Sequence, residues 1–295
     1  MRQAVEESVF DLRQPAERTV PLVVASPHSG ASYPEDLLNS SRLDPATLRR
    51  SEDSFVDALF AAAPEFGAPF IAARFPRAYL DVNREPWELD PAMFVDALPN
   101  FVNTRSPRVR MGLGTIARIV ASGEEIYARK LRFAEARRRV EELYQPYHNA
   151  LRRLVEESEA AFGGYLLLDC HSMPSTAGAV GARDSAADIV LGDCHGAACA
   201  PRLVEAARAF LAGRGFTVVL NRPYAGGFTT GHYGSPRRGR NALQIEINRA
   251  LYMDERLYQR RPAFDRIAAE MTALIVYLGQ TSETYFGAPR RAAAE

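Results

Sequence analysis

Four places in this chain carry side chains that could together hold a metal ion and activate water. They are two histidines, a pair of adjacent carboxylates and one carboxylate within an apolar stretch: His28, His171, Glu52-Asp53 and Glu246. Two neutral imidazoles and one carboxylate make the ligand set of a catalytic zinc ion, whose fourth position is left for water. A further carboxylate that is not a ligand can act as general base toward that water. Because no compact motif such as H-E-x-x-H is present, the fold has to bring these residues together.

Both histidines follow short apolar runs of the kind that form buried strands. The first run is residues 20–26 (VPLVVAS), shortly before His28, and the second is residues 165–168 (YLLL), shortly before His171. Side chains alternate along a strand, so Asp169 and His171 are expected to point to the same side. In an open α/β sheet ligands bind outside the carboxyl ends of the strands, and both histidines are expected there.

The carboxylates lie in two different settings. Glu52-Asp53 opens a pattern that predicts a helix over residues 52–63, where acids are also favoured by the helix dipole regardless of function. Glu246 lies in a predicted strand over residues 242–248 (ALQIEIN), on the polar side of its alternation. A carboxylate inside an otherwise apolar strand is costly unless it has a partner, which marks Glu246 as a functional candidate.

Strands and helices are expected to alternate along the rest of the chain. Further strands are expected at residues 69–75, 79–82, 188–192 and 216–220, and further helices from Asp44-Pro45, over 124–162 with an interruption near Gln145-Pro146, over 195–213 and over 254–277. Irregular chain is expected at residues 86–114, 173–187 and 224–234. This alternation predicts a single α/β domain over residues 1–295 with a mostly parallel sheet.

The composition excludes several classes of function. Lys and Arg balance Asp and Glu at 36 each, so no global field favours nucleic acid or an acidic membrane surface. The three cysteines show no C-x-x-C spacing, which argues against a disulfide framework or a zinc knuckle. The amino terminus has no apolar signal region, and no segment approaches the ~18 apolar residues of a membrane span. We therefore expect a cytoplasmic protein, monomeric or a small homo-oligomer, that acts on a small molecule.

Other mechanisms have weaker candidates. A hydrolase without metal would need Cys170 or Ser29 as nucleophile, but strand alternation turns Cys170 away from the histidine that follows it, and no G-x-S-x-G elbow occurs. The only lysine, Lys130, lies in a charge-rich stretch expected to be helical, which leaves Schiff-base chemistry without a candidate. Of the other histidines, His148 and His195 are expected to be structural.

Six motifs in order along the chain resemble those of the N-formylglutamate amidohydrolase family. They are SPHSG (26–30), EDSFVDALF (52–60), FPRAYLDVNRE (75–85), LLLDCHSMP (166–174), GGFTTGHYG (226–234) and LQIEINRALYMDE (243–255). The resemblance spans about residues 20–260. It implies a mixed, mostly parallel sheet flanked by helices, with the phosphorylase/hydrolase-like fold of zinc carboxypeptidases and aspartoacylase-type deacylases. It also implies hydrolysis of N-formyl-L-glutamate to formate and L-glutamate, a step of histidine breakdown.

The resemblance also implies roles for residues. His28 and His171 fall at the metal histidines and Glu246 at the catalytic glutamate, while the pair Asn83-Arg84 resembles one that grips a substrate carboxylate in the carboxypeptidase relatives. The implied ion is Zn²⁺, although histidine and carboxylate ligands also accept other divalent metals.

The third metal ligand departs from the pattern of those relatives. They place a glutamate three residues after the first histidine, whereas His28 is followed by Ser, Gly and Ala. Asp53 is the preferred third ligand because it lies four residues before Asp57, on the same face of the predicted helix, and Glu52 is the alternative.

A dicarboxylate substrate needs local cations, because the chain has no net charge. Arg84 is the first candidate and Arg249 the second, since a planar guanidinium meets a carboxylate with two parallel hydrogen bonds. Either arginine could instead pair with an internal acid such as Asp81 or Glu85. His232, on a glycine-punctuated loop, is a candidate for a hydrogen bond to substrate. Two alternatives stay open: a deacylase of another N-acyl amino acid, and a non-catalytic binding protein of the same fold.

Overall fold

The computed structural model describes residues 9–177 and 187–287. The chain divides into two compact units. Unit 1 comprises Met1–Asp11, Pro27–Asp53 and Ala72–Ala150, and unit 2 comprises Leu12–Ser26, Ser54–Ile71 and Leu151–Glu295. The single-domain organisation over residues 1–295 stays a prediction.

A seven-stranded sheet has the strand order β1-β3-β2-β4-β7-β5-β6. The strands are β1 (Phe10–Arg13), β2 (Leu22–Ser26), β3 (Phe70–Ala73), β4 (Tyr165–Met173), β5 (Ile189–Gly192), β6 (Val218–Leu220) and β7 (Arg240–Asn248). Within unit 2, β4 pairs in parallel with β2 and β7, β6 pairs in parallel with β5, and β5 runs antiparallel to β7. The predicted mixed, mostly parallel sheet is therefore confirmed.

The paired strands β4 and β7 form the centre of unit 2. All nine residues of β4 are buried, as expected for a strand whose first half is continuously apolar and covered on both faces. The parallel register pairs Leu168 with Leu243 and His171 with Glu246. Neighbouring residues of paired strands point to the same face, so the register places these two polar side chains together on one side of the sheet.

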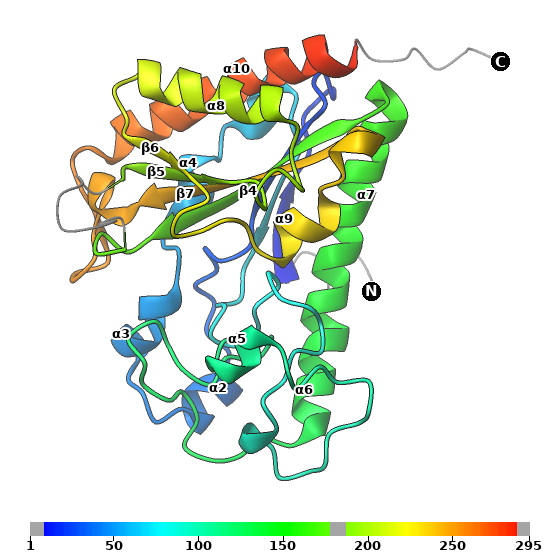
Figure 1. Cartoon of the computed structure of the whole chain (residues 1–295). Helices are drawn as coiled ribbons and strands as arrows, with labels where there is room; N and C mark the ends of the chain where they lie inside the picture. The colour runs from blue at the N-terminus through cyan, green and yellow to red at the C-terminus, as the bar shows by residue number, and fades with distance from the viewer. Residues whose placement is uncertain (1–8, 178–186, 288–295) are drawn as a thin grey trace. The chain divides into compact units, whose positions relative to one another are not determined.

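Helices cover both faces of the strands of unit 2. On one face, α4 (Val56–Leu59), α8 (Pro201–Gly213) and α10 (Phe264–Phe286) pack together, and Figure 1 shows α8 and α10 side by side. The short helix α9 (Phe228–Tyr233) packs against β4 and β7. A small hairpin of β8 (Met253–Asp254) and β9 (Gln259–Arg260) precedes α10.

Unit 1 is built from short helices joined by irregular chain. They are α2 (Glu35–Ser40), α3 (Pro45–Leu48), η1 (Arg49–Ser51), η3 (Pro91–Met93), α5 (Pro107–Arg110), α6 (Phe133–Arg139) and the π-helical η4 (Val140–Tyr144), which leads into α7 (Gln145–Phe162). Asp44 caps α3 as predicted, accepting hydrogen bonds from the amides of Ala46 and Thr47. Residues 86–114 are irregular apart from η3 and α5, in agreement with the prediction.

Several predicted elements of unit 1 and its borders were wrong. The helix expected over 52–63 is reduced to α4, because Phe55 adopts a left-handed conformation (φ 68°) that ends any helix through it. Residues 79–82 form turns and coil rather than a strand. The long helix begins at Phe133 instead of residue 124, and its expected interruption takes the form of the π-helical turn just before Pro146.

Other boundaries in unit 2 were also wrong. The helix expected from His195 begins at Pro201, since His195 lies in a turn with φ 56°. The expected loop at 224–234 contains α9, and α10 begins ten residues later than expected because β8 and β9 occupy the chain before it. The loop expected at 173–187 lies partly outside the described residues, and its first residue, Met173, is the last of β4.

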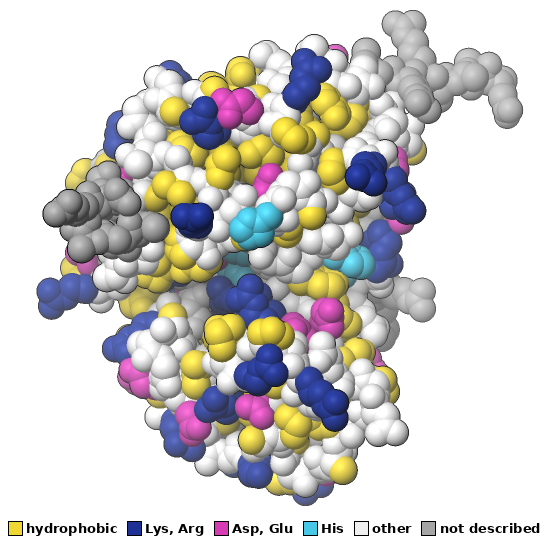
Figure 2. All heavy atoms as spheres, viewed as in Figure 1, with side chains coloured by type: hydrophobic (Ala, Val, Ile, Leu, Met, Phe, Trp, Pro, Cys, Tyr) yellow, Lys and Arg dark blue, Asp and Glu magenta, His cyan; other side chains and the backbone are white. Residues whose placement is uncertain are grey.

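Charged side chains of both signs lie on the face of the molecule drawn in Figure 2. Figure 2 shows Lys and Arg side chains spread over the face in view, with Asp and Glu side chains among them. Among residues 9–177 and 187–287, no helix combines the length and apolar character that crossing a membrane requires.

Candidate functional site

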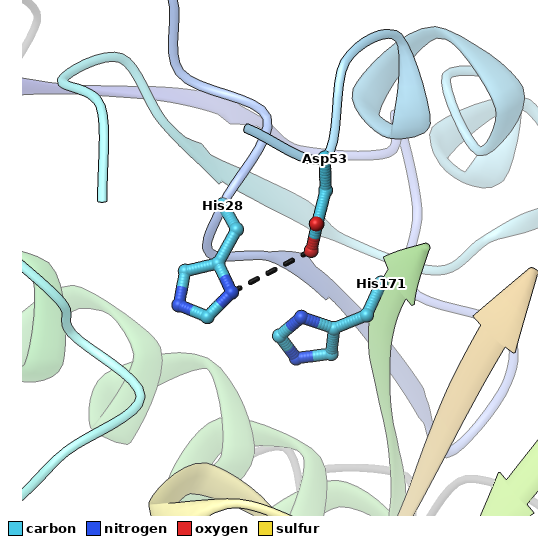
Figure 3. Close-up of side chains that lie close together, drawn as sticks. All are labelled: His28, Asp53 and His171. Carbon is cyan, nitrogen blue, oxygen red and sulfur yellow. Dashed lines mark ion pairs between the residues drawn. The ribbon is translucent and has the colours of Figure 1, made fainter. Parts of the chain in front are cut away.

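His28, in unit 1, is buried and has a carboxylate beside each ring nitrogen. Its Nε2 lies 2.6 Å from Oδ1 of Asp81, and its Nδ1 lies 3.5 Å from Oδ2 of Asp53 (Figure 3). All three side chains are almost fully buried. The short bond at Nε2 means that this nitrogen donates to Asp81, so Nδ1 is the nitrogen that can act as a metal ligand.

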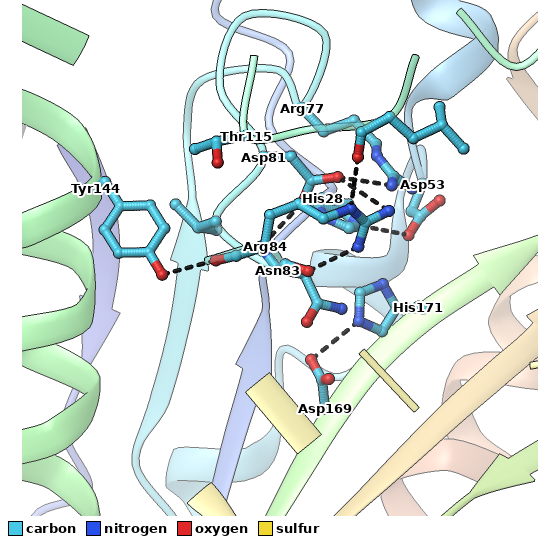
Figure 4. Close-up of polar contacts among 12 residues, drawn as sticks. His28, Asp53, Arg77, Asp81, Asn83, Arg84, Thr115, Tyr144, Asp169 and His171 are labelled. Atoms are coloured by element: carbon cyan, nitrogen blue, oxygen red, sulfur yellow. Dashed lines mark hydrogen bonds and ion pairs between the residues drawn. The ribbon is translucent and has the colours of Figure 1, made fainter. Parts of the chain in front are cut away.

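Asp81 is the centre of a buried polar cluster. Besides His28, its carboxylate accepts hydrogen bonds from the amide of Asn83 (2.8 Å) and from Nη2 of Arg77 (2.8 Å), and Nη2 of Arg84 lies at 3.5 Å (Figure 4). Burial by itself would raise the pKa of the Asp81 carboxyl, but Arg77, Arg84 and His28 outweigh it and hold that pKa well below its usual value. Asp81 is therefore a permanent anion that orients His28.

The turn that carries His28 packs closely against other backbone. A Cβ atom at Gly30 would come within 2.2 Å of the carbonyl oxygen of Phe75, so only glycine fits there. Ser32 donates a backbone hydrogen bond to the carbonyl of Arg74 (2.9 Å), which holds the turn in place.

Asp53 and Glu52 have different surroundings. The amide of Asp53 donates to the carbonyl of His28 (3.0 Å), which ties the two residues together. Glu52 accepts two hydrogen bonds from Arg49 (3.0 and 3.2 Å) and one from Tyr33 (3.1 Å). The expectation that Asp53 shares a helical face with Asp57 was wrong, since Asp53 precedes the helix. As a candidate third metal ligand, Asp53 is still favoured over Glu52, because it is bonded to His28 while Glu52 is bonded to Arg49 and Tyr33.

His171, in unit 2, is also held by an aspartate. Its Nε2 lies 2.9 Å from Oδ1 of Asp169, and Oδ2 of Asp169 accepts a hydrogen bond from Oγ1 of Thr230 on α9 (2.9 Å). The pairing confirms that Asp169 and His171 lie on one side of β4 (Figure 4). His171 does not follow the strand as expected, because β4 continues to Met173.

Glu246 lies on β7, in register with His171. It is 7% exposed, and its Oε1 accepts a hydrogen bond from Nε2 of Gln244 (2.9 Å), two residues earlier on the same side of the strand. This bond holds one oxygen of the Glu246 carboxylate in place.

Arg84 is buried, and much of its guanidinium binds the protein itself. Nε donates to the carbonyl of Leu113 (2.9 Å) and Nη1 to the carbonyl of Asn83 (2.6 Å), while Nη2 faces Asp81. Burial lowers the pKa of Arg84 to about 10, opposed by the charge of Asp81, so the side chain remains a cation at neutral pH. The pairing with Asp81 considered from the sequence is thus present.

Arg249 and His232 are placed differently from each other. Arg249, in η6 (Arg249–Leu251), is buried and donates from Nε to Oγ of Ser172 (3.1 Å). His232 lies on α9 rather than on a loop, and its ring stacks on Phe228 with centroids 4.8 Å apart. The α9 residue whose side chain bonds to the His171-Asp169 pair is Thr230.

The surroundings of Cys170 and His148 argue against a catalytic role for either side chain. Burial and the charge of Asp169 raise the pKa of the Cys170 thiol well above its usual value, so it is a poor nucleophile. His148 is structural, as predicted: its Nε2 donates to the carbonyl of Val82 (2.8 Å), and its ring packs on Tyr144.

Sequence reasoning missed the residues that orient the site. Asp169, Thr230 and Gln244 were assigned no role, and Asp81 was considered only as a partner of Arg84, not of His28. Asp169 and Gln244 lie two residues from His171 and Glu246, so strand alternation was a usable signal for both. Asp81 and Thr230 are 53 and 61 residues from their partners, and no local pattern indicates them.

Comparison with known proteins agrees with the motifs. The family model described as N-formylglutamate amidohydrolase matches residues 20–253. The chain is 30% identical over 241 residues to N-formylglutamate deformylase of Pseudomonas putida, covering 80% of this chain and 83% of the relative. It is 28% identical over 260 residues to the protein of that name from Pseudomonas aeruginosa, covering 87% and 90%.

Comparison with solved structures agrees with the sequence comparison. The crystal structure of N-formylglutamate amidohydrolase from Ralstonia eutropha JMP134 has a TM-score of 0.89 and 38% identity, covering 94% of this chain and 99% of that one. A protein from Agrobacterium tumefaciens, at 20% identity and a TM-score of 0.67, shares the fold. With a family match over most of its length and relatives that cover nearly all of it, this chain belongs to the N-formylglutamate amidohydrolase family.

Proposed function

We propose that this protein hydrolyses N-formyl-L-glutamate to formate and L-glutamate with the help of one divalent metal ion. The observation that carries the proposal is a pair of buried histidines, His28 and His171, each with Nε2 held by a buried aspartate. A carboxylate that holds one ring nitrogen directs the other toward a metal and raises its basicity. The family and the names of the relatives supply the substrate.

The proposed ligands are Nδ1 of His28, a carboxylate oxygen of Asp53 and Nδ1 of His171. The three side chains are buried and each offers one ligand atom. The fit can be checked within unit 1, because tetrahedral zinc with bonds of about 2.0–2.1 Å places two ligand atoms about 3.4 Å apart. The observed separation of His28 Nδ1 and Asp53 Oδ2 is 3.5 Å.

Chain connectivity supports adding His171 to the set. Ala25 of β2 pairs with Asp169 of β4 in the parallel register of unit 2. His28 follows Ala25 by three residues and His171 follows Asp169 by two. A metal bound by these residues would polarise the formyl carbonyl and make a bound water acidic enough to attack at neutral pH.

Glu246 is proposed to move the proton. It accepts a proton from the attacking water and returns it to the nitrogen of glutamate as the C–N bond breaks. The hydrogen bond from Gln244 holds the carboxylate in place for both transfers. Asn83, Arg84 and Arg249 are proposed to bind the carboxylates of the substrate, and His232 to contribute a hydrogen bond.

The direct test is a substrate panel with the metal-loaded protein. We expect hydrolysis of N-formylglutamate and much slower release of amino acid from N-acetylglutamate and N-succinylglutamate, measured by the appearance of glutamate. A preference for one of the other acyl groups would make the protein a different deacylase, and no turnover of any of them would favour a binding protein. The role in histidine breakdown, the cytoplasmic location and the oligomeric state stay predictions.

Replacing Asp81 with Asn tests the orientation of His28. The amide keeps the shape but loses the charge that Arg77, Arg84 and His28 surround, so we expect metal affinity to fall about 10- to 100-fold. Competition with a chelator measures it. Asp90→Asn is a matched control in unit 1, because Asp90 pairs with Arg118 outside the site, and it should keep the affinity of the parent. Equal affinities for Asp81→Asn and the parent would show that His28 does not depend on this carboxylate.

Replacing Arg84 with Lys tests recognition of a substrate carboxylate. A lysine cannot reproduce the planar guanidinium. The transition-state stabilisation obtained from kcat/KM for N-formylglutamate should therefore fall by about 2–3 kcal/mol, the scale of a charged hydrogen bond. N-formylmethionine, which lacks the second carboxylate, should be a poor substrate of the parent. If the parent hydrolyses both compounds equally well, the protein does not select a dicarboxylate.

A further inference from the structure

The loop that carries Asp81, Asn83 and Arg84 is bonded to one continuous helical segment. Three of its backbone carbonyls, within residues 79–84, accept hydrogen bonds from buried side chains of α6, η4 and α7. The bonds run from Arg139 Nη1 to Tyr79 O (3.1 Å), from His148 Nε2 to Val82 O (2.8 Å) and from Tyr144 Oη to Arg84 O (2.7 Å).

The spacing of the three donors requires the π-helical turn. In an α-helix, residues 139 and 144 would point about 140° apart, because five residues at 100° each overshoot one turn. In η4 (Val140–Tyr144) the backbone bonds join residues five apart, which brings Arg139 and Tyr144 to about the same face. His148 follows Tyr144 by four residues of α-helix and shares that face. The π-helical turn thus aligns all three donors with the loop.

The donors are themselves held in place. The ring of His148 lies 4.3 Å from that of Tyr144, and the guanidinium of Arg139 lies 3.9 Å above the ring of Tyr79. A carbonyl oxygen only accepts, so Nε2 of His148 must carry the proton. All three side chains are at most 5% exposed, and each bonded carbonyl would be left without this partner if its donor were removed.

We infer that Arg139, Tyr144 and His148 form a loop clamp that sets the position of the substrate-binding Arg84. This rests on the proposed function in that Arg84 is taken to bind a carboxylate of the substrate. The Tyr144 bond acts on Arg84 itself, while the Arg139 and His148 bonds act on either side of Asp81. The three are positioning residues, because each acts through the loop.

Tyr144→Phe is the sharpest test, because it removes one oxygen atom and keeps the ring stack on His148. Displacing Arg84 weakens binding of the substrate carboxylate, so KM for N-formylglutamate should rise about tenfold or more while kcat changes little. The residual rate with N-formylmethionine should be unchanged. Equal losses on both substrates, or no loss on either, would overturn the clamp.

A second measurement does not depend on the proposed activity. The amide of Asp81 donates to the carbonyl of Thr115 (2.8 Å) and that of Asn83 to the Asp81 carboxylate (2.8 Å), so hydrogen exchange at these two amides reports on loop order. Exchange should accelerate about tenfold in Tyr144→Phe. The control Tyr165→Phe removes an equivalent bond in unit 2, from Tyr165 Oη to Tyr233 O (2.7 Å), and should leave these amides unchanged.

A variant that restores the hydrogen-bond donor at residue 148 distinguishes a positioning role of His148 from a role in packing alone. His148→Gln keeps a donor that can reach the Val82 carbonyl, whereas His148→Ala does not. We expect slow exchange at the loop amides to return in the Gln variant only, and equal exchange in both would contradict the clamp. If the parent fails to hydrolyse N-formylglutamate, the proposed function is wrong, while the exchange experiment still decides whether the clamp exists.

Discussion

The Glu246→Gln enzyme is expected to turn over about 10² to 10⁴ times more slowly than the parent while keeping its metal. Gln has nearly the same shape as Glu and cannot take a proton from water. The register with His171 and the bond from Gln244 place Glu246 on the polar side of β7, so the substitution is expected to remove the proposed proton transfer without disturbing the core. The measurements are kcat with N-formylglutamate and metal content by elemental analysis.

The other end of β7 offers a matched control. Glu159 bonds to Arg240, the first residue of that strand, at 2.9 Å. Glu159→Gln is the same chemical change at a surface ion pair, which contributes little, and its kcat should stay within about twofold of the parent. A Glu246→Gln enzyme with near-normal turnover would assign the proton transfer to another group.

Removing any one of the three proposed ligands is expected to abolish stoichiometric metal binding. Changes in the residues that merely orient ligands cost about 10- to 100-fold in affinity, so His28→Ala, Asp53→Asn and His171→Ala should each lose more than 100-fold. Metal added at 100 times its dissociation constant should stabilise the parent by about 2.7 kcal/mol, and the variants by much less. Elemental analysis and thermal unfolding with and without metal check both statements.

Glu52 is the decisive control for the third ligand. It is adjacent to Asp53 and is also a carboxylate, but Arg49 and Tyr33 already bind it. Glu52→Gln should keep a full equivalent of metal. If Glu52→Gln lost the metal and Asp53→Asn kept it, the third ligand would be misassigned; if all the variants kept it, the site would lie elsewhere.

Much of unit 2 was predictable because strand patterns are local. The apolar runs before His28 and His171 became β2 and the first half of β4, and the alternation around Glu246 became β7. Period-two alternation correctly placed Asp169 and His171 on one side of β4. Such statements need only the geometry of one strand, and they held even where the predicted ends were wrong.

The helices were less predictable because tertiary contacts overrode local periodicity. The pattern over residues 52–63 is helical in composition, yet a left-handed Phe55 restricts the helix to Val56–Leu59. The centroid of the Phe55 ring lies 6.2 Å from that of Phe264 and 5.3 Å from Cζ of Arg260. Both residues are more than 200 positions further along the chain. Contacts of this range carry no signal in a local window.

By itself the sequence determined the chemical class of this protein and the strands that carry it. The resemblance of six ordered motifs indicated the family, and strand alternation predicted β4 and β7, because motifs and alternation are properties of short segments. Only the tertiary structure decided which groups orient them. Asp81 reaches His28 across 53 residues, and Tyr144 and His148 reach the loop carbonyls across 60 and 66. Those partners are selected by packing, since a buried donor or acceptor must find whatever group the fold brings within hydrogen-bonding distance.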